Sequence, residues 1–252
     1  MIFIWIRATV DWADEAAFVA QMPAELPAKV ALWNETFTLP YHLFRLRVRE
    51  IAAESLARVE GAVCAEWDEI PDGAVFLPVD DDDWFSPDAA RALEAALEPG
   101  VDAYVWSGRW LEIPMNLGHR VYLARRRLFP WTWERWLLAT NNHALVKRSS
   151  FEPRLVENHA RTDRWFKGEQ RQGRVRLKRL DGCLSVTNRT FASRTALLWD
   201  KPSIGRAELL RKYRGYRVRY DRPVAPEVAW SEPYQRAMAE LMRELELRPG
   251  VA

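Results

Sequence analysis

Apolar and polar residues alternate in blocks over the first 80 residues, and these blocks predict strands separated by helices. Acidic residues from Asp11 onward open a short helix that ends near Pro23, and Pro40 precedes a longer helix over residues 41–59 with one mostly apolar face. Strands that alternate with helices indicate an α/β fold with a mostly parallel central sheet flanked by helices. The strands are predicted at residues 2–10, 29–33 and 75–79.

The rest of the chain continues this pattern with less regular spacing. The apolar runs on either side of Asp181 and Gly182 predict a β-hairpin, because this dipeptide is typical of a tight turn. Residues from 192 onward are basic, are interrupted by prolines, and end in a predicted helix over 234–247. Further helices are predicted at 88–97 and 153–166, and further strands at 102–107 and 142–147.

We therefore expect one domain over residues 1–191 and a basic, helical C-terminal appendage over 192–252. Composition supports this size, since 252 residues with 48% hydrophobic residues can build a substantial core. The net charge of +2 creates no overall field that would favour nucleic acid as a partner. The apolar opening of the chain is too short before Arg7 to span a membrane, and two cysteines favour a reducing compartment, so we expect a cytoplasmic protein.

Four consecutive carboxylates, Asp80 to Asp83, follow the predicted strand at 75–79. Ser86, Pro87 and Asp88 behind them are typical of a helix start, with Ser86 as the N-cap. The carboxylates therefore lie at the carboxyl end of a strand, which is where open α/β sheets bind ligands. Adjacent like charges repel, so we expect a hard divalent cation, Mn²⁺ or Mg²⁺, to hold them together. A solvated acidic turn is the alternative interpretation.

This segment resembles the DxD motif of the GT-A glycosyltransferases, particularly inverting family 2 and the related bacterial putative rhamnosyltransferases. The likeness rests on Phe76-Leu77, the acidic run with Trp84, and Pro87. It implies a single GT-A-like domain in which Asp80 and Asp82 are the metal carboxylates. Asp82 is the better candidate for direct metal contact, and Asp80 lies nearer the ribose or bridges through water. The nucleotide-sugar contacts are then assigned to Asp80, Asp81, Asp83 and Arg49.

The resemblance extends, with less specific motifs, over roughly residues 45–170. Residues 141–148 are similar to a strand that precedes the acceptor region in the family. Beyond that strand the family carries an adjacent Glu-Asp pair that includes the catalytic base. Here Glu157 and Asp163 are separated by five residues, so Asp163 is the first candidate for the base and Glu157 the second. The family's amino-terminal nucleotide signature is absent.

The resemblance implies a metal-dependent, inverting transferase that moves a sugar from a nucleotide-diphosphate donor to an acceptor hydroxyl. Residues 1–107 would form the donor and metal half, and residues 108–191, rich in tryptophan and arginine, the acceptor half. The acceptor would be a sugar, a glycolipid or a small molecule, and the basic residues beyond 160 also suit contact with a membrane surface. Two alternatives stay open: a nucleotidyltransferase or other Mg²⁺-dependent phosphoryl-transfer enzyme, and a non-catalytic module that binds Ca²⁺ and a polyanion. No glycine occurs in residues 1–40, which argues against a phosphate-binding loop there.

Overall fold

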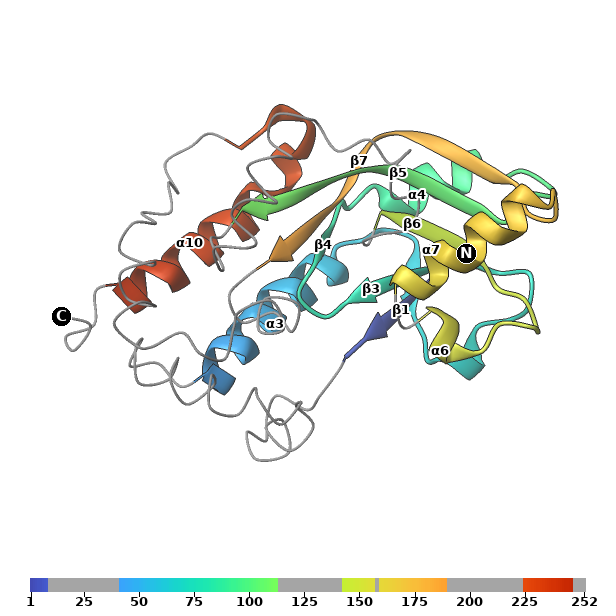
Figure 1. The fold of residues 1–252 in the computed structure, drawn as a ribbon. Helices are drawn as coiled ribbons and strands as arrows, with labels where there is room; N and C mark the ends of the chain where they lie inside the picture. The colour runs from blue at the N-terminus through green and yellow to red at the C-terminus, as the bar shows by residue number, and fades with distance from the viewer. Residues whose placement is uncertain (9–40, 113–141, 157–158, 190–223, 247–252) are drawn as a thin grey trace.

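The computed structural model describes residues 1–8, 41–112, 142–156, 159–189 and 224–246 (Figure 1). Several expected features lie outside these residues. They are the helix from Asp11, the strand at 29–33, the tryptophans between residues 113 and 141, the candidate base Glu157, and residues 192–223 of the predicted appendage.

The described residues form an α/β fold around a seven-stranded sheet in the order β2-β1-β3-β6-β5-β7-β4. Strands β1, β2, β3, β5 and β7 run in one direction, and β4 and β6 run in the other. The described sheet is thus mixed, with three parallel and three antiparallel pairs of neighbouring strands. Its strands are β1 (Ile2–Arg7), β2 (Ala62–Cys64), β3 (Val75–Asp80), β4 (Trp84–Phe85), β5 (Ala103–Glu112), β6 (His143–Val146) and β7 (Leu177–Arg189).

Helices cover both faces of this sheet (Figure 1). They are α3 (Tyr41–Ala57), α4 (Ala89–Ala96), α6 (Pro153–Val156), α7 (His159–Arg171) and α10 (Glu232–Glu246), with 3₁₀ turns η1 (Trp67–Glu69) and η2 (Pro226–Ser231). None of the helices in the described part of the chain is both long and apolar enough to cross a membrane.

Alternate residues of β1 and β3 enter two separate cores, as the pleat of a strand requires. Ile4 and Leu77 pack with residues of α3 and α4, including Leu56 and Leu93. Trp5 and Phe76, one position away in each strand, pack on the opposite face with residues of α6 and α7, including Val156 and Phe166. Successive residues of β3 therefore point to opposite faces of the sheet. Its last residue, Asp80, lies on the same face as Phe76, which is the face covered by α6 and α7.

The short link from β3 to β4 shows that the sheet is strongly curled. Only Asp81, Asp82 and Asp83 separate the two strands in sequence, although three strands lie between them in the sheet. The four Cα–Cα steps from Asp80 to Trp84 span at most about 15 Å, whereas four strand spacings in a flat sheet amount to about 19 Å. The far edge must therefore bend back towards the centre, and the acidic run lies inside that bend.

The predicted hairpin at Asp181 and Gly182 is wrong. Residues 177–189 form one continuous strand, β7, which runs parallel to β5. The extra residues are absorbed as a bulge, since Val105 pairs with Arg179 while Ser107, only two residues further, pairs with Cys183. Gly182 takes a positive φ of 90° within this bulge. The Asp-Gly dipeptide correctly predicted a residue with positive φ. The pairing with the long strand β5 nevertheless keeps the chain extended on both sides of Gly182.

Most other elements match their expected positions. The predictions are confirmed for β3, α4, β5, β6 and the closing helix α10, and for the helix at 41–59, which is α3. The helix expected at 153–166 is described as α6 and α7, with residues 157–158 outside the description. Ser86 is not the N-cap of α4, because Asp88 holds that position; the Ser86 hydroxyl instead accepts a hydrogen bond from the Asp88 amide. Strands β2 and β4 were not expected.

The C-terminal helix α10 lies against the core of the fold, beside α3 (Figure 1). The Tyr234 ring packs against the Trp84 ring, with ring centroids 5.9 Å apart. The Trp230 indole, in η2, donates a hydrogen bond to the Cys183 carbonyl of β7. The described end of the predicted appendage therefore contacts both the strand that follows the acidic run and the curled edge.

Candidate functional site

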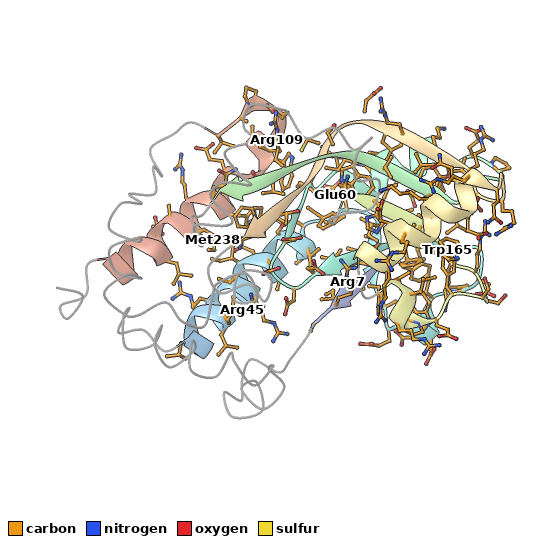
Figure 2. All side chains as sticks on the ribbon, in the orientation of Figure 1. Arg7, Arg45, Glu60, Arg109, Trp165 and Met238 are labelled. Carbon is orange, nitrogen blue, oxygen red and sulfur yellow. The ribbon has the colours of Figure 1, made fainter. Side chains whose placement is uncertain are left out.

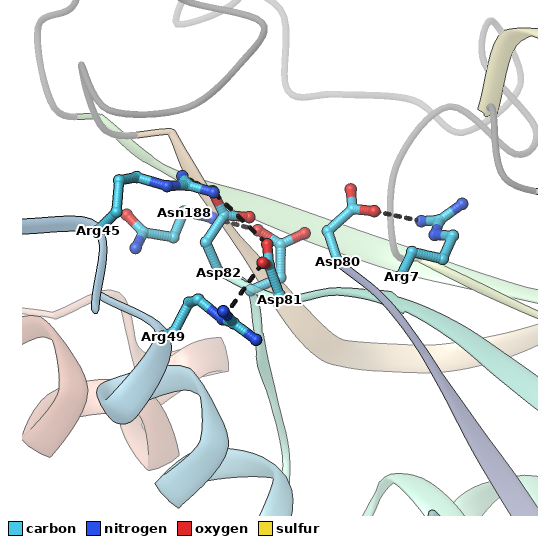
Figure 3. Close-up of polar contacts among 8 residues, drawn as sticks. Arg7, Arg45, Arg49, Asp80, Asp81, Asp82 and Asn188 are labelled. Atoms are coloured by element: carbon cyan, nitrogen blue, oxygen red, sulfur yellow. Dashed lines mark hydrogen bonds and ion pairs between the residues drawn. The ribbon is translucent and has the colours of Figure 1, made fainter. Parts of the chain in front are cut away.

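The acidic run begins at the carboxyl end of β3 and forms a tight turn into β4. The Asp83 amide donates a hydrogen bond of 3.1 Å to the Asp80 carbonyl, which closes the turn. Its side chains do not point to one centre. Figure 3 shows Asp80 beside Arg7, whereas Asp81 and Asp82 lie beside Arg45 and Arg49 of α3.

Asp80 lies on the face covered by α6 and α7. It is the register partner of Arg7, the last residue of β1, so both side chains leave the sheet on the same side. One guanidinium nitrogen of Arg7 is 2.8 Å from a carboxylate oxygen of Asp80. The other terminal nitrogen donates a 2.9 Å hydrogen bond to the carbonyl oxygen of Val156, at the end of α6. The Arg7 side chain is buried, whereas that of Asp80 is 37% exposed.

Asp81 and Asp82 face helix α3. Arg45 donates a hydrogen bond of 3.1 Å to Asp82 and lies 3.6 Å from a carboxylate oxygen of Asp81. Arg49, one helical turn further along, lies 3.4 Å from the other Asp81 oxygen. Residues four apart in a helix project from one face, so a single side of α3 supplies both cations. The predicted contact residue Arg49 is thus at the acidic run.

Asp83 is the most buried of the four carboxylates and has a structural partner. Its side chain accepts a 2.7 Å hydrogen bond from the backbone amide of Asn188, near the end of β7. This bond ties the turn after β3 to β7, the strand next to the edge strand β4. The Asn188 side chain is buried as well, and its amide nitrogen contacts the Met238 sulfur of α10 at 3.8 Å. The expected role of Asp83 in nucleotide binding stays a prediction.

Burial makes Asp82 the unusual acid of the group. Desolvation raises the pKa of Asp82 from 3.8 to about 7, and the neighbouring carboxylates Asp81 and Asp80 add to the rise. The positive charge and hydrogen bond of Arg45 act in the opposite direction and do not cancel it. The pKa of Asp82 therefore lies near neutral pH. An additional cation beside this carboxyl group would lower the pKa and favour the ionised form.

The charges of the site nearly balance within the protein itself. The four acids, when ionised, carry four negative charges, and Arg7, Arg45 and Arg49 supply three positive ones. Among the residues that the structure describes, no group of three His, Cys, Asp or Glu side chains is arranged to hold a metal ion. The repulsion that suggested a cation from the sequence is thus met here by arginines from β1 and α3.

Residues 141–148, the second region of the resemblance, lie next to the carboxyl end of β3. Strand β6 runs antiparallel to β3, with Phe76 opposite Leu145, so the start of β6 lies beside the end of β3. His143, at that start, is buried. The side-chain amide of Asn142 donates a 3.0 Å hydrogen bond to the Trp106 carbonyl and so fixes β6 against β5. Asn142 therefore has a clear structural role.

The candidate base Asp163 lies on α7 and is mostly buried. Its carboxylate is 2.5 Å from the Lys167 ammonium, one turn further along the helix. Glu157 lies outside the described residues, but it directly follows Val156 in the chain, and the Val156 carbonyl is joined to Asp80 through Arg7.

Two arginines and one asparagine of this site were not singled out from the sequence. Arg7 could have been found, because the ends of neighbouring parallel strands lie side by side and β1 ends in a cation where β3 ends in an acid. Arg45 could have been found from its spacing of four to Arg49. Asn188 could not be found from the sequence, because the predicted hairpin did not place the end of β7 beside β4.

Comparisons with protein-family models, with curated proteins and with solved structures found no match to this chain.

Proposed function

We propose that this protein is a metal-dependent glycosyltransferase of the GT-A type, which transfers a sugar from a nucleotide-diphosphate donor to an acceptor hydroxyl with inversion. The single observation that carries the proposal is the acidic run at the carboxyl end of β3, in which Asp80, Asp81 and Asp82 pair with three arginines. The position of the run supports it as well, because ligands in open α/β sheets bind outside the carboxyl ends of the strands, and β3 ends there in Asp80.

The chemistry of the donor set fits Mn²⁺ or Mg²⁺. Mg²⁺ in such enzymes is held by one or two carboxylates together with substrate phosphates and water, so a complete cage of protein ligands is not required. Asp80 and Asp82 would hold the ion, since one is accessible to solvent and the other has a pKa near neutrality that an extra cation would lower. When bound, the ion would act as a Lewis acid towards the diphosphate leaving group.

The arginines supply the remaining positive charge for a diphosphate. Guanidinium groups form paired hydrogen bonds with phosphate oxygens, as they do with carboxylates. Arg45 and Arg49 contact Asp81 and Asp82 at 3.1 to 3.6 Å, so small rearrangements would let the same side chains contact a phosphate next to these acids. Binding of a cation to the acids would favour this exchange, because it replaces the charge that the arginines now provide.

A carboxylate must also accept the proton of the acceptor hydroxyl. Asp163 remains the first candidate and Glu157 the second. The Asp163 carboxylate, which pairs with the Lys167 ammonium, has the chemistry of a general base. Glu157 is favoured by its attachment to Val156, whose carbonyl is held one guanidinium away from Asp80.

The proposed activity is tested by a thermal-shift screen of nucleotide sugars with and without Mn²⁺, followed by a turnover assay on the best donor. We expect stabilisation by one nucleotide diphosphate sugar only when Mn²⁺ is present, and loss of turnover in excess chelator. Asp82→Asn should lower turnover roughly 100- to 1000-fold. Asp88→Asn is the matched control, because this exposed acid pairs with Arg91 on the next helix. Stabilisation by nucleoside triphosphates alone would favour phosphoryl transfer instead.

The base is tested by comparing Asp163→Asn with Glu157→Gln. Loss of the base should lower the transfer rate and leave donor affinity nearly unchanged, because the missing interaction develops in the transition state. Lys167→Met controls for the loss of the ion pair alone. If Glu157→Gln is inactive while Asp163→Asn turns over normally, the base is Glu157. Normal transfer by both variants would rule out both assignments.

A further inference from the structure

We infer that Arg7 is a positioning residue that couples the acidic run to the segment carrying the candidate bases, and that a metal ion acts on this segment through it. The inference rests on the proposed function. Its basis is the double contact of one buried guanidinium, which binds the Asp80 carboxylate at 2.8 Å (Figure 3) and the Val156 carbonyl at 2.9 Å.

The location of Arg7 makes this contact specific. β1 and β3 are adjacent parallel strands, and Arg7 is aligned with Asp80, so the strand register brings the guanidinium to this carboxylate. On its other side is the end of α6, where the carbonyl oxygen of the last residue, Val156, accepts the second hydrogen bond. Figure 2 shows Arg7 between the end of β1 and the α6–α7 helices. A lysine at this position could not donate to both groups with one planar fork.

The Asp80 carboxylate is the point at which an ion can intervene. Its side chain is 37% exposed, whereas the side chain of Arg7 is 7% exposed. A cation can therefore reach the carboxylate from solvent without displacing the buried stem of Arg7. An ion bound to Asp80 competes with Arg7 for the carboxylate oxygens, and the Val156 carbonyl remains as the partner of the guanidinium. Residues 151–171 would then respond to the metal.

The test is hydrogen–deuterium exchange of peptides covering residues 151–171 in the full chain. Without metal, we expect Asp80→Asn and Arg7→Gln each to accelerate exchange there, on the order of tenfold, because each removes one end of a charge-assisted link. Adding Asp80→Asn to Arg7→Gln should cause little further change. Arg47→Gln is the matched control, since this arginine is exposed and pairs with Glu50 on α3.

The second arm adds Mn²⁺. Its binding is measured directly by electron paramagnetic resonance, as the loss of the signal of free Mn²⁺. In the wild-type protein Mn²⁺ should change exchange at residues 151–171, and in Arg7→Gln it should not, although Mn²⁺ binds at least as tightly because a competing cation is gone. Equal responses of wild type and Arg7→Gln would overturn the inference, as would additive effects of the two substitutions in the metal-free arm. If Mn²⁺ does not bind the wild type at all, the proposed function fails, and the metal-free arm still decides whether Arg7 makes the link.

Discussion

Two acids of one motif, Asp80 and Asp82, are held in opposite ways. Asp80 lies on the α6–α7 face with a partly exposed carboxylate, whereas the carboxylate of Asp82 is mostly buried against α3. Each is paired with an arginine, but the Asp80 carboxylate is much more exposed to water than that of Asp82. Solvent screening therefore weakens the Arg7–Asp80 pair, while the Arg45–Asp82 pair interacts at a lower effective dielectric constant.

The difference separates two tasks within a run of four identical residues. A partly exposed carboxylate can exchange its arginine for an incoming cation at small cost. A buried carboxylate with a raised pKa stores unfavourable free energy, which a cation can release. We therefore interpret Asp80 as the residue that admits an ion and Asp82 as the residue that gains most from binding it.

The largest expected effect comes from removing the cation beside the buried acid. Arg45→Met should lower the free energy of unfolding by about 3–5 kcal/mol at pH 8, because it leaves a buried carboxylate without its partner. Urea unfolding of the wild type and variant measures this difference. The loss should be smaller at pH 5, where Asp82 can bind a proton instead.

Arg47→Met is the matched control for this change. Arg47 lies on the same helix with an exposed side chain, so its loss should cost less than about 0.5 kcal/mol. Equal losses for the two variants, or a loss at Arg45 that does not depend on pH, would contradict the assignment of Arg45 as the counter-ion of Asp82.

The next effect is the pH dependence that Asp82 gives to the metal-free protein. Its pKa is 3.8 in an ordinary setting and about 7 in the fold, so the folded state binds a proton more tightly than the unfolded state does. The resulting stabilisation is complete below about pH 4 and is lost as the pH rises through 7. We expect the wild type to lose roughly 2–4 kcal/mol relative to Asp82→Asn across this interval. Parallel stability curves for the two proteins would show that Asp82 titrates normally.

The smallest effect is expected at the exposed end of the motif. Asp80→Asn should change the free energy of unfolding by about 1 kcal/mol or less, because the carboxylate is partly in water and solvent screening weakens its pair with Arg7. The measurement is urea unfolding at low ionic strength. A loss as large as that of Arg45→Met would remove the contrast between the two acids.

The sequence predicted the core elements of this fold well where pattern and local signals agreed. β3 is an uninterrupted apolar strand that ends in acids, and both its position and the location of the acidic run at its carboxyl end were anticipated. The α3 helix followed from its leading proline and apolar face. In these segments the nearest neighbours in sequence decide the structure.

The failures occur where distant strands decide the structure. Gly182 has the positive φ of a turn residue, yet the pairing of β7 with β5 carries the strand through it. Because β7 was expected to fold back, the pairing of Trp84 with Val186 and the contact of Asp83 with Asn188 could not be foreseen. Arg7 and Arg45 were missed for a related reason, since ion pairing between strands and helices depends on their register and packing.

The most direct test of the central claim is calorimetric titration of the metal-free protein with Mn²⁺ at pH 6 and pH 8. If Asp80 and Asp82 hold the ion, the wild type should bind one Mn²⁺ more tightly at pH 8 and release a proton at pH 6, because the metal and the proton compete for Asp82. Asp82→Asn should abolish this binding, and Asp88→Asn should leave it intact. Absence of Mn²⁺ binding by the wild type, or equal binding by Asp82→Asn, would contradict the claim that this motif is a metal site.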